Sequence, residues 1–381
     1  MRVALVCGRH LPAQDGVADY TARLAEALSA AGVEPLLAGA APSPHVVCDG
    51  WGPRGVLQAA RALRRLRPDV VHVQSAPSAY GFRGWVGLLP LLLRGTPVVT
   101  TLHEYGWWAW PARVPRRVWA RLERSGRVDR ETLLLAPASA EVLCTNEAHA
   151  AVVRARTGRQ PLVVPIGPNV PDAGADRAAA RAALGVADGT TLLVTFGFVH
   201  PVKGVRYLLD AAAQLRDELD LRVVVAGGFT SLALPEDEAR AFRAELEQHA
   251  RDAGVADLVS FTGHVPSAQV SSLLHAADAV VLAATAGVTT RSGALVAALA
   301  HGAPVLATVA DPPDPALVPG EHVLPIARVR DGDAVAAAVR ALVADPALGP
   351  RLAGAGRRLA APRSWPVLAR RHAELYARLV P

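Results

Sequence analysis

Short apolar runs alternate along the chain with amphipathic segments whose apolar residues recur at helical spacing. Most of the runs are continuously apolar, which is typical of strands buried on both faces. We predict strands over Val3–Cys7, Val33–Ala38, Val70–Gln74, Val98–Leu102, Val142–Thr145, Leu162–Val164, Leu192–Phe196, Arg222–Ala226, Leu258–Phe261, Ala279–Leu282 and Val305–Thr308. Strands of this kind separated by helices indicate an α/β fold with parallel sheets covered by helices.

Helices are predicted between these strands and after the last of them. They include Val17–Ala31, Gly55–Leu66, Val205–Leu215, Leu295–Ala300 and Trp365–Val380. Because the alternation occurs as two series, one in each half of the chain, it predicts two doubly wound, Rossmann-like domains. Such sheets bind ligands outside the carboxyl ends of their strands, so we expect two substrates to meet in a central cleft that both domains face.

The boundary between the domains is predicted from a segment rich in proline and glycine. This segment, Val163–Pro171, is followed by an Ala-rich helical stretch, which places the linker near residues 166–188. We therefore predict a first domain over residues 1–168 and a second over residues 186–364. The last helix, residues 365–381, follows the second domain.

The charge balance narrows the choice of partners. The chain of 381 residues has 40 Lys and Arg against 34 Asp and Glu, a net charge of +6, which favours acidic partners. Aromatic residues rarely interleave with the basic ones, so the sequence predicts no nucleic-acid partner. A solvated basic face is the simplest interpretation, with loose attachment to an anionic membrane surface as the alternative.

The cysteines and the chain start bear on the compartment. Cys7, Cys48 and Cys144 have neither close pairing nor metal-ligand spacing, and the first and third end apolar runs, where we expect them to be buried. The chain enters its first strand without a signal-peptide pattern, and its most apolar stretch, Trp85–Leu93, is too short to span a bilayer. We expect a cytoplasmic protein, with peripheral contact at the inner membrane face as the alternative.

A glycine-rich turn carries the first chemical signal. Gly197 follows a predicted strand, and Lys203-Gly204 opens the next helix. A helix N-terminus offers free N–H groups and a partial positive charge, so this loop is typical of a diphosphate site, although its spacing is not that of a Walker A loop. Lys203 is the only lysine in the chain. The alternative is an ordinary strand–helix turn with an exposed lysine.

A second polar segment follows the strand Ala279–Leu282 and leads into another predicted helix. It reads Thr289-Thr290-Arg291-Ser292-Gly293-Ala294. Its hydroxyl residues are good helix N-caps, Gly293 would let the backbone close on a ligand, and Arg291 could clamp a phosphate with two hydrogen bonds. A plain N-cap with a surface arginine is the alternative.

Three further segments stand at strand ends. Asp15–Tyr20 contains Gly16 and Val17, Thr100–Glu104 ends in His103 and Glu104, and Phe261–Pro266 contains Gly263, His264 and Val265. Glycine in the first permits close backbone approach to a substrate, and backbone groups of the third could read a nucleobase edge. The alternative for His103 is a structural histidine, and the alternative for the third segment is ordinary loop geometry. Trp107, Trp108 and Trp110 follow His103 and could form an aromatic wall for an acceptor or pack beneath a helix.

Together these segments resemble the family-4 glycosyltransferases of GT-B fold, and the resemblance extends over nearly the whole chain. The segments that carry it are the turn at Gly16, His103, Val164–Gly167, Gly197–Gly204, Phe261–Val265 and Ala297–Val305, which is similar to the family's EAMACGxPV stretch. The resemblance implies transfer of a sugar from a nucleotide-diphosphate donor, with retention of anomeric configuration and without a metal ion or cofactor.

The resemblance also implies how the parts divide the work. The second domain would bind the nucleotide sugar, the first would bind a glycan, lipid-linked or small-molecule acceptor, and the last helix would cross back onto the first domain. Lys203 would neutralise the leaving diphosphate, with Arg291 as a second cation, and His103 would contact the donor sugar. The remaining predicted binding residues are Gly16, Val17, Glu104, Gly197, Phe198, His200, Gly263, His264, Val265, Thr289, Thr290, Ser292, Gly293, Ala294 and Leu295.

Two departures from the family stand out. The donor loop usually has two glutamates eight positions apart, and here Thr289 and Ala297 stand at those positions. The family also commonly has an arginine where this chain has Phe198. We hypothesise that Arg291 replaces the missing cation and that Thr289 and Thr290 hydrogen-bond the sugar.

Alternative functions remain open at the level of the sequence. The missing glutamates fit a catalytically retired protein that binds a nucleotide sugar or supports a partner enzyme. An epimerase or a phosphorylase on the same fold is a further alternative, although no lysine besides Lys203 could carry pyridoxal phosphate. A nicotinamide dehydrogenase is disfavoured because no G-x-G-x-x-G follows the first strand.

Overall fold

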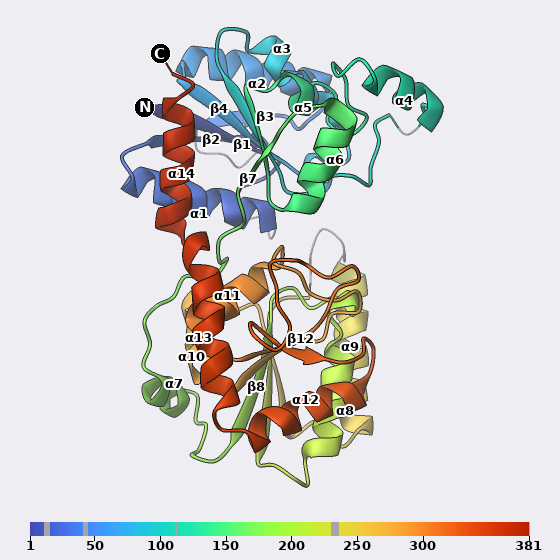
Figure 1. Ribbon diagram of the computed structural model, residues 1–381, viewed down its shortest axis with the longest axis vertical. Helices are drawn as coiled ribbons and strands as arrows, with labels where there is room; N and C mark the ends of the chain where they lie inside the picture. Colours follow the sequence, from blue (N-terminus) through green and yellow to red (C-terminus); the bar gives the residue numbers. More distant parts are fainter. Residues whose placement is uncertain (11–15, 41–44, 112, 230–235, 381) are drawn as a thin grey trace. The chain divides into compact units, whose positions relative to one another are not determined.

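The computed structural model divides the chain into two compact units, each built on one parallel sheet (Figure 1). It describes residues 1–10, 16–40, 45–111, 113–229 and 236–380. Unit 1 comprises Met1–Ile166 and Trp365–Pro381, and unit 2 comprises Gly167–Ser364. Among the described residues, no helix is long and apolar enough to cross a membrane.

Unit 1 has a seven-stranded sheet in the order β3-β2-β1-β4-β5-β6-β7, parallel throughout. Its strands are β1 (Arg2–Cys7), β2 (Glu34–Ala40), β3 (Val46–Cys48), β4 (Val70–Ser75), β5 (Val98–Leu102), β6 (Glu141–Cys144) and β7 (Leu162–Val163). Successive residues of β1 serve opposite faces: Val3 and Leu5 pack against one set of helices, whereas Ala4 and Val6 pack against the other. Both faces are therefore buried, which explains the continuous apolar pattern.

The helices of unit 1 cover those two faces. One face carries α1 (Gly16–Ala30) and the C-terminal α14 (Trp365–Ala377), and the other carries α2 (Pro53–Leu66) together with shorter helices. The remaining helical segments are η1 (Ser78–Tyr80), η2 (Gly84–Leu88), α3 (Leu89–Leu92), α4 (Arg116–Glu123), α5 (Leu135–Ala138) and α6 (Glu147–Thr157).

Helix α14 joins unit 1 although it follows unit 2 in the sequence. It packs against α1 (Figure 1), and its Tyr376 is fully buried beside β1. The ring of His72 on β4 lies 2.5 Å from the Tyr376 hydroxyl through Nδ1 and 2.7 Å from the Thr101 hydroxyl through Nε2. This buried polar chain links α14 to two central strands, and its pairing offsets the cost of burying the imidazole.

Unit 2 has a six-stranded parallel sheet in the order β10-β9-β8-β11-β12-β13. Its strands are β8 (Thr191–Phe196), β9 (Leu221–Ala226), β10 (Val259–Gly263), β11 (Ala279–Leu282), β12 (Val305–Thr308) and β13 (Leu324–Ile326). Its helices are α7 (Arg177–Ala183), η3 (Pro201–Lys203), α8 (Val205–Leu215), α9 (Glu236–Asp252), α10 (Ser267–Ala276), α11 (Gly293–His301), α12 (Gly332–Ala344), α13 (Leu348–Ala360) and η4 (Ala361–Arg363). The strand order reverses between β8 and β11, the position where doubly wound sheets bind their ligands.

The predicted elements occur where the pattern placed them, with ends within a few residues. Two short strands, β3 and β13, were not predicted. Each has three residues and forms an edge of its sheet. A run of three residues is too short to show a period, and β13 also contains Pro325, which an edge strand tolerates. Cys7, Cys48 and Cys144 are all buried thiols.

Candidate functional site

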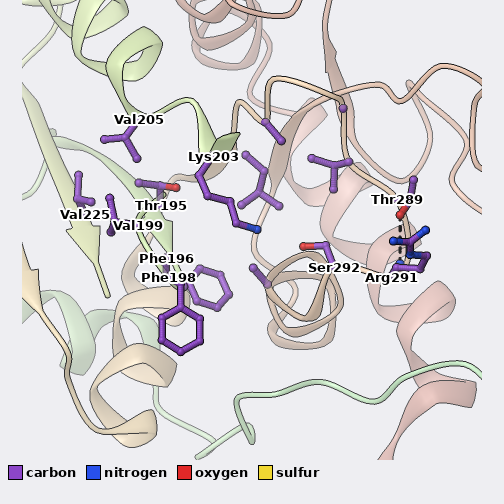
Figure 2. A pocket seen from close by; sticks show the side chains of 16 residues that line it. Thr195, Phe196, Phe198, Val199, Lys203, Val205, Val225, Thr289, Arg291 and Ser292 are labelled. Carbon is purple, nitrogen blue, oxygen red and sulfur yellow. Dashed lines mark hydrogen bonds between the residues drawn. The ribbon is translucent and has the colours of Figure 1, made fainter. Parts of the chain in front are cut away.

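A cavity of about 220 Å³ lies in unit 2 at the reversal of the strand order (Figure 2). The carboxyl end of β8 contributes Thr195 and Phe196, and the end of β11 contributes Leu282. The loop after β8 and the loop after β11 complete the walls. Seven of the predicted site residues line this cavity, namely Gly197, Phe198, Lys203, Thr289, Arg291, Ser292 and Ala294.

The loop after β8 is shaped by two glycines with positive φ. Gly197 has φ +106°, and Gly204, immediately before α8, has φ +69°. A methyl group on Gly204 would stand 1.9 Å from the carbonyl oxygen of Ala283, so glycine is required there by the neighbouring chain. The absence of a side chain at Gly204 thus permits the close approach of this loop to the end of β11.

Lys203 directs its amine into the cavity (Figure 2). The side chain keeps exposed surface, yet the cavity walls remove part of its water and lower the pKa of its amine. Among the residues that the structure describes, no carboxylate lies within ion-pair distance of Lys203. The position therefore offers a positive charge without a protein counterion, which is what a bound anion needs.

The N-terminus of α11 opens onto the same cavity, where Ser292 and Ala294 line the wall. The Ser292 hydroxyl accepts a hydrogen bond from the backbone N–H of Leu295 at 3.2 Å, as an N-cap. The N–H of Leu295, one of the predicted binding residues, is thereby occupied. The N–H groups of Gly293 and Ala294 precede the first acceptor in the helix and remain available by geometry.

Gly293 also has a packing role that the sequence did not predict. A methyl group built on it would lie 3.2 Å from Cγ of Asn169, so the absent side chain makes room for Asn169. The sequence reasoning gave Asn169 no role. Its contact with the start of α11 explains why glycine, an unfavourable helix residue, begins this helix.

Thr290 does not line the cavity, although we expected it to bind the sugar beside Thr289. Both its N–H and its hydroxyl donate to Asp314, each at 2.7 Å, and the residue is buried. These bonds lower the pKa of Asp314 despite its burial. Asp314 thus holds the loop before α11 in place, a role that no local sequence signal indicated because the partner is 24 positions away.

The remaining predicted residues of unit 2 lie outside the cavity lining. Gly263 ends β10 with φ +66°, followed by the exposed His264 and the half-buried Val265. His200 caps η3, with its Nδ1 accepting from the Val202 N–H at 3.3 Å. Their expected contacts with a nucleobase remain predictions.

Four predicted residues belong to unit 1. His103 follows β5, and its Nε2 lies 2.8 Å from Oε1 of the buried Gln74, while its ring meets the ring of Tyr20 edge-on at 4.7 Å. Burial first, and the nearby His149 and His372 next, lower the pKa of His103 to about 3, so the ring is neutral near pH 7. Since a carbonyl oxygen only accepts, Nε2 carries the proton and Nδ1 carries a lone pair.

Glu104 lines a second cavity, of about 20 Å³, together with Arg83, Trp108 and Glu131. Its volume suits about one water molecule.

Gly16 and Val17 open α1, where Gly16 is exposed and Val17 half-buried. No atom of the described residues lies within 4 Å of a methyl group added to Gly16. Asp15, in the same predicted segment, lies outside the described residues.

The tryptophans after β5 divide between the two roles considered for them. Trp110 packs against Trp85, with ring centroids 4.9 Å apart, and against Gly84. Trp107 is 60% exposed and touches the ring of Phe82, which is 48% exposed. Trp110 is therefore a packing residue, whereas Trp107 and Phe82 present an open aromatic surface.

Comparison with known proteins accounts for both units. The family described as "Glycosyltransferase Family 4" matches residues 14–169, and "Glycosyl transferases group 1" matches residues 190–345. The D-inositol 3-phosphate glycosyltransferase of Streptomyces avermitilis is 30% identical over 338 residues, covering 84% of this chain and 68% of the relative. That of Geodermatophilus obscurus is 33% identical, covering 78% of this chain and 63% of the relative.

Solved structures share the whole fold. Sucrose-phosphate synthase from Thermosynechococcus elongatus superposes with a TM-score of 0.73 at 19% identity, covering 100% of this chain and 99% of that one. Anabaena HepE, solved in complex with UDP-glucose, superposes with a TM-score of 0.71 at 18% identity, covering 99% and 100%. Both likenesses extend over the two units, and the fold is GT-B.

Proposed function

Because the chain belongs to glycosyltransferase family 4 and is a glycosyltransferase, we propose that the cavity of unit 2 binds the diphosphate of a nucleotide-sugar donor. The sugar passes to an acceptor hydroxyl with retention of configuration at the anomeric carbon and without a metal ion. HepE has been solved with UDP-glucose, which makes a uridine nucleotide the first donor to test.

The observation that carries this proposal is the charge of the cavity. Its described lining includes Lys203 and Arg291 but no Asp or Glu, and two helices, α8 and α11, begin at its wall. Helix N-termini and unpaired cations attract a diphosphate. Protein sites for Mg²⁺ usually include a carboxylate ligand, and the described lining contains no carboxylate.

The proposed chemistry follows from these charges. As the bond between the anomeric carbon and the diphosphate oxygen breaks, negative charge grows on the leaving group. Lys203, Arg291 and the free N–H groups of Gly293 and Ala294 stabilise that charge as it develops. The acceptor oxygen attacks from the same face, and the leaving phosphate oxygen takes the acceptor proton. No protein nucleophile is needed.

The acceptor belongs to unit 1 in this proposal. His103, neutral and with Nδ1 unprotonated, offers a hydrogen-bond acceptor to a hydroxyl of the donor sugar. Two relatives are named for D-inositol 3-phosphate, so that compound enters the acceptor screen beside glycans and lipid-linked acceptors.

Peripheral membrane contact is part of the proposal. Helix α4 carries Arg116, Arg117 and Arg121, and its Val118 and Leu122 are 42% and 44% exposed. Cationic and apolar side chains on one short helix favour an anionic lipid interface. Cosedimentation with phosphatidylglycerol vesicles, compared with phosphatidylcholine vesicles, tests this contact.

The test of the donor site is a thermal-shift screen against UDP, GDP, dTDP and ADP and their common sugar conjugates, with and without EDTA. A ligand that binds only the native state raises its stability by mass action, about 2.7 kcal/mol at a hundredfold excess over Kd. We expect a shift with one nucleotide that survives EDTA and is lost in Lys203→Ala. A shift that EDTA abolishes would refute metal independence, and no shift with any nucleotide would refute the donor site.

A further inference from the structure

A cluster of two histidines and one aspartate lies in unit 2 away from the donor cavity. It comprises Asp172, in the segment between β7 and α7; His275, near the end of α10; and His301, the last residue of α11. One carboxylate oxygen and two imidazole nitrogens lie within 4.8 Å of one another. We propose that this cluster binds a divalent transition-metal ion, Zn²⁺ being the best fit.

The protonation of His301 suits a metal ligand. Its Nδ1 lies 2.7 Å from the carbonyl oxygen of Ala297, which only accepts, so Nδ1 carries the proton. In the neutral ring Nε2 then holds a lone pair, and this atom lies 2.9 Å from the Ser271 hydroxyl. A backbone carbonyl that fixes the tautomer of a histidine is the usual support of a metal-bound imidazole.

The other two ligands are held less tightly. The His275 Nε2 lies 2.6 Å from Oδ1 of Asp172, and the same oxygen accepts the Gly174 N–H at 2.8 Å. The His275 side chain is 14% exposed and the Asp172 side chain 45% exposed. A cation can therefore enter from solvent, and both groups have room to move.

The donor set selects the metal. Two imidazoles and one carboxylate suit Zn²⁺, which takes nitrogen ligands at about 2.0–2.1 Å and leaves a fourth position for water. The edge of such a tetrahedron is about 3.3 Å by that bond length. Asp172 Oδ1 and His275 Nε2, now 2.6 Å apart, would therefore separate by roughly 0.7 Å on binding, and both would approach the buried His301.

The ion would link the first residues of unit 2 to the helices α10 and α11 of the same unit. Asp172 lies six residues after Ile166, the last residue of the first segment of unit 1, and the ion would tie it to α10 and α11. The donor cavity adjoins the opposite end of α11, a helix of 9 residues and therefore about 13 Å long. The ion would not contact the diphosphate, so this inference stands without the proposed function.

The experiment uses untagged protein dialysed against EDTA, titrated with Zn²⁺ by calorimetry and with Co²⁺ by visible absorption. We expect one site that Mg²⁺ does not occupy, a tetrahedral Co²⁺ spectrum and a rise in Tm with Zn²⁺. His275→Gln and Asp172→Asn should each weaken Zn²⁺ binding at least tenfold.

The matched control is His249→Gln. His249 Nε2 lies 2.6 Å from Oδ1 of Asp210, the same pair geometry without a second histidine ligand. Zn²⁺ affinity like that of the wild type in His275→Gln and Asp172→Asn, or loss of binding in His249→Gln, would overturn the proposal. So would an unmodified protein that binds no Zn²⁺. Circular dichroism in EDTA checks that each variant is folded. If His275→Gln unfolds, Asp172→Asn still tests the site, because Asp172 is exposed and its substitution should leave the fold intact.

Discussion

Gly204 lies against the carbonyl oxygen of Ala283, so close that a methyl group on Gly204 would stand 1.9 Å from that oxygen. Gly204 immediately precedes α8, and Ala283 follows the last residue of β11. The contact holds the loop with Lys203 against the strand beside it. It therefore helps to position the Lys203 side chain in the cavity.

We expect Gly204→Ala to destabilise the protein by about 1–3 kcal/mol more than Gly158→Ala, since only the former overpacks its surroundings. Gly158 is the matched control because it has φ +68° against +69° for Gly204 but no atom within 4 Å of an added methyl group. The left-handed backbone alone costs about 1–2 kcal/mol in both variants. Urea unfolding measures the difference, and equal losses would contradict the close contact.

Lys203→Ala should reduce kcat by about 10²–10³, by analogy with removal of one group that stabilises a developing oxyanion. Within the described lining the amine is a point charge without a carboxylate partner, and Arg291 is the other cation there. Arg206→Ala is the control, because Arg206 lies three residues later, on α8, and is paired with Glu245 at 2.8 Å. Turnover close to that of the wild type in Lys203→Ala would remove Lys203 from the mechanism.

Arg291→Ala should lower kcat/KM by about 10- to 100-fold, the worth of a hydrogen bond to a charged group. Arg291→Lys keeps the charge but loses the two-pronged hydrogen bond, so an intermediate value is expected. Steady-state kinetics with the donor identified by thermal shift makes the comparison. Unchanged turnover and donor affinity in Arg291→Ala would refute the idea that it replaces the family's missing cation.

Stability should fall as the pH is lowered from about 6.5 towards 4, partly through His372. This residue is 1% exposed, and burial lowers the pKa of its imidazole to about 4. Between that value and the unfolded pKa of about 6.5 the unfolded chain binds the extra proton, so acid favours unfolding. The contribution is fully present above pH 6.5 and is lost as the pH falls through 4.

The slope from one such histidine is at most about 1.4 kcal/mol per pH unit. His372→Leu should reduce the slope of the unfolding free energy against pH by up to that amount between pH 6 and 4.5, whatever it does to stability at pH 7. Urea titrations at three pH values measure both slopes. An unchanged slope would show that His372 is not kept neutral by burial.

The sheets could be predicted from the sequence because their strands are buried on both faces and therefore read as continuous apolar runs. The predicted strand Val98–Leu102 matches β5 in both bounds. The three-residue β3 could not be predicted, since so short a run shows no period.

The candidate site could be predicted only in part. Lys203 and Arg291 were found because strand–glycine–helix patterns mark sheet edges. The bonds from Thr290 to Asp314, and the contact of Gly293 with Asn169, join positions far apart in the chain. Such contacts depend on tertiary packing, and one sequence carries no signal of them.

The single lysine of this chain determines how the protein reacts with amine-modifying reagents. Apart from the N-terminus, Lys203 is the only primary amine, and its lowered pKa leaves more of it uncharged and nucleophilic at a given pH than an ordinary lysine. An acylating probe would therefore modify the Lys203 amine selectively, without the introduction of a reactive residue. Its labelling rate would report occupancy of the cavity, because a bound anion shields the amine.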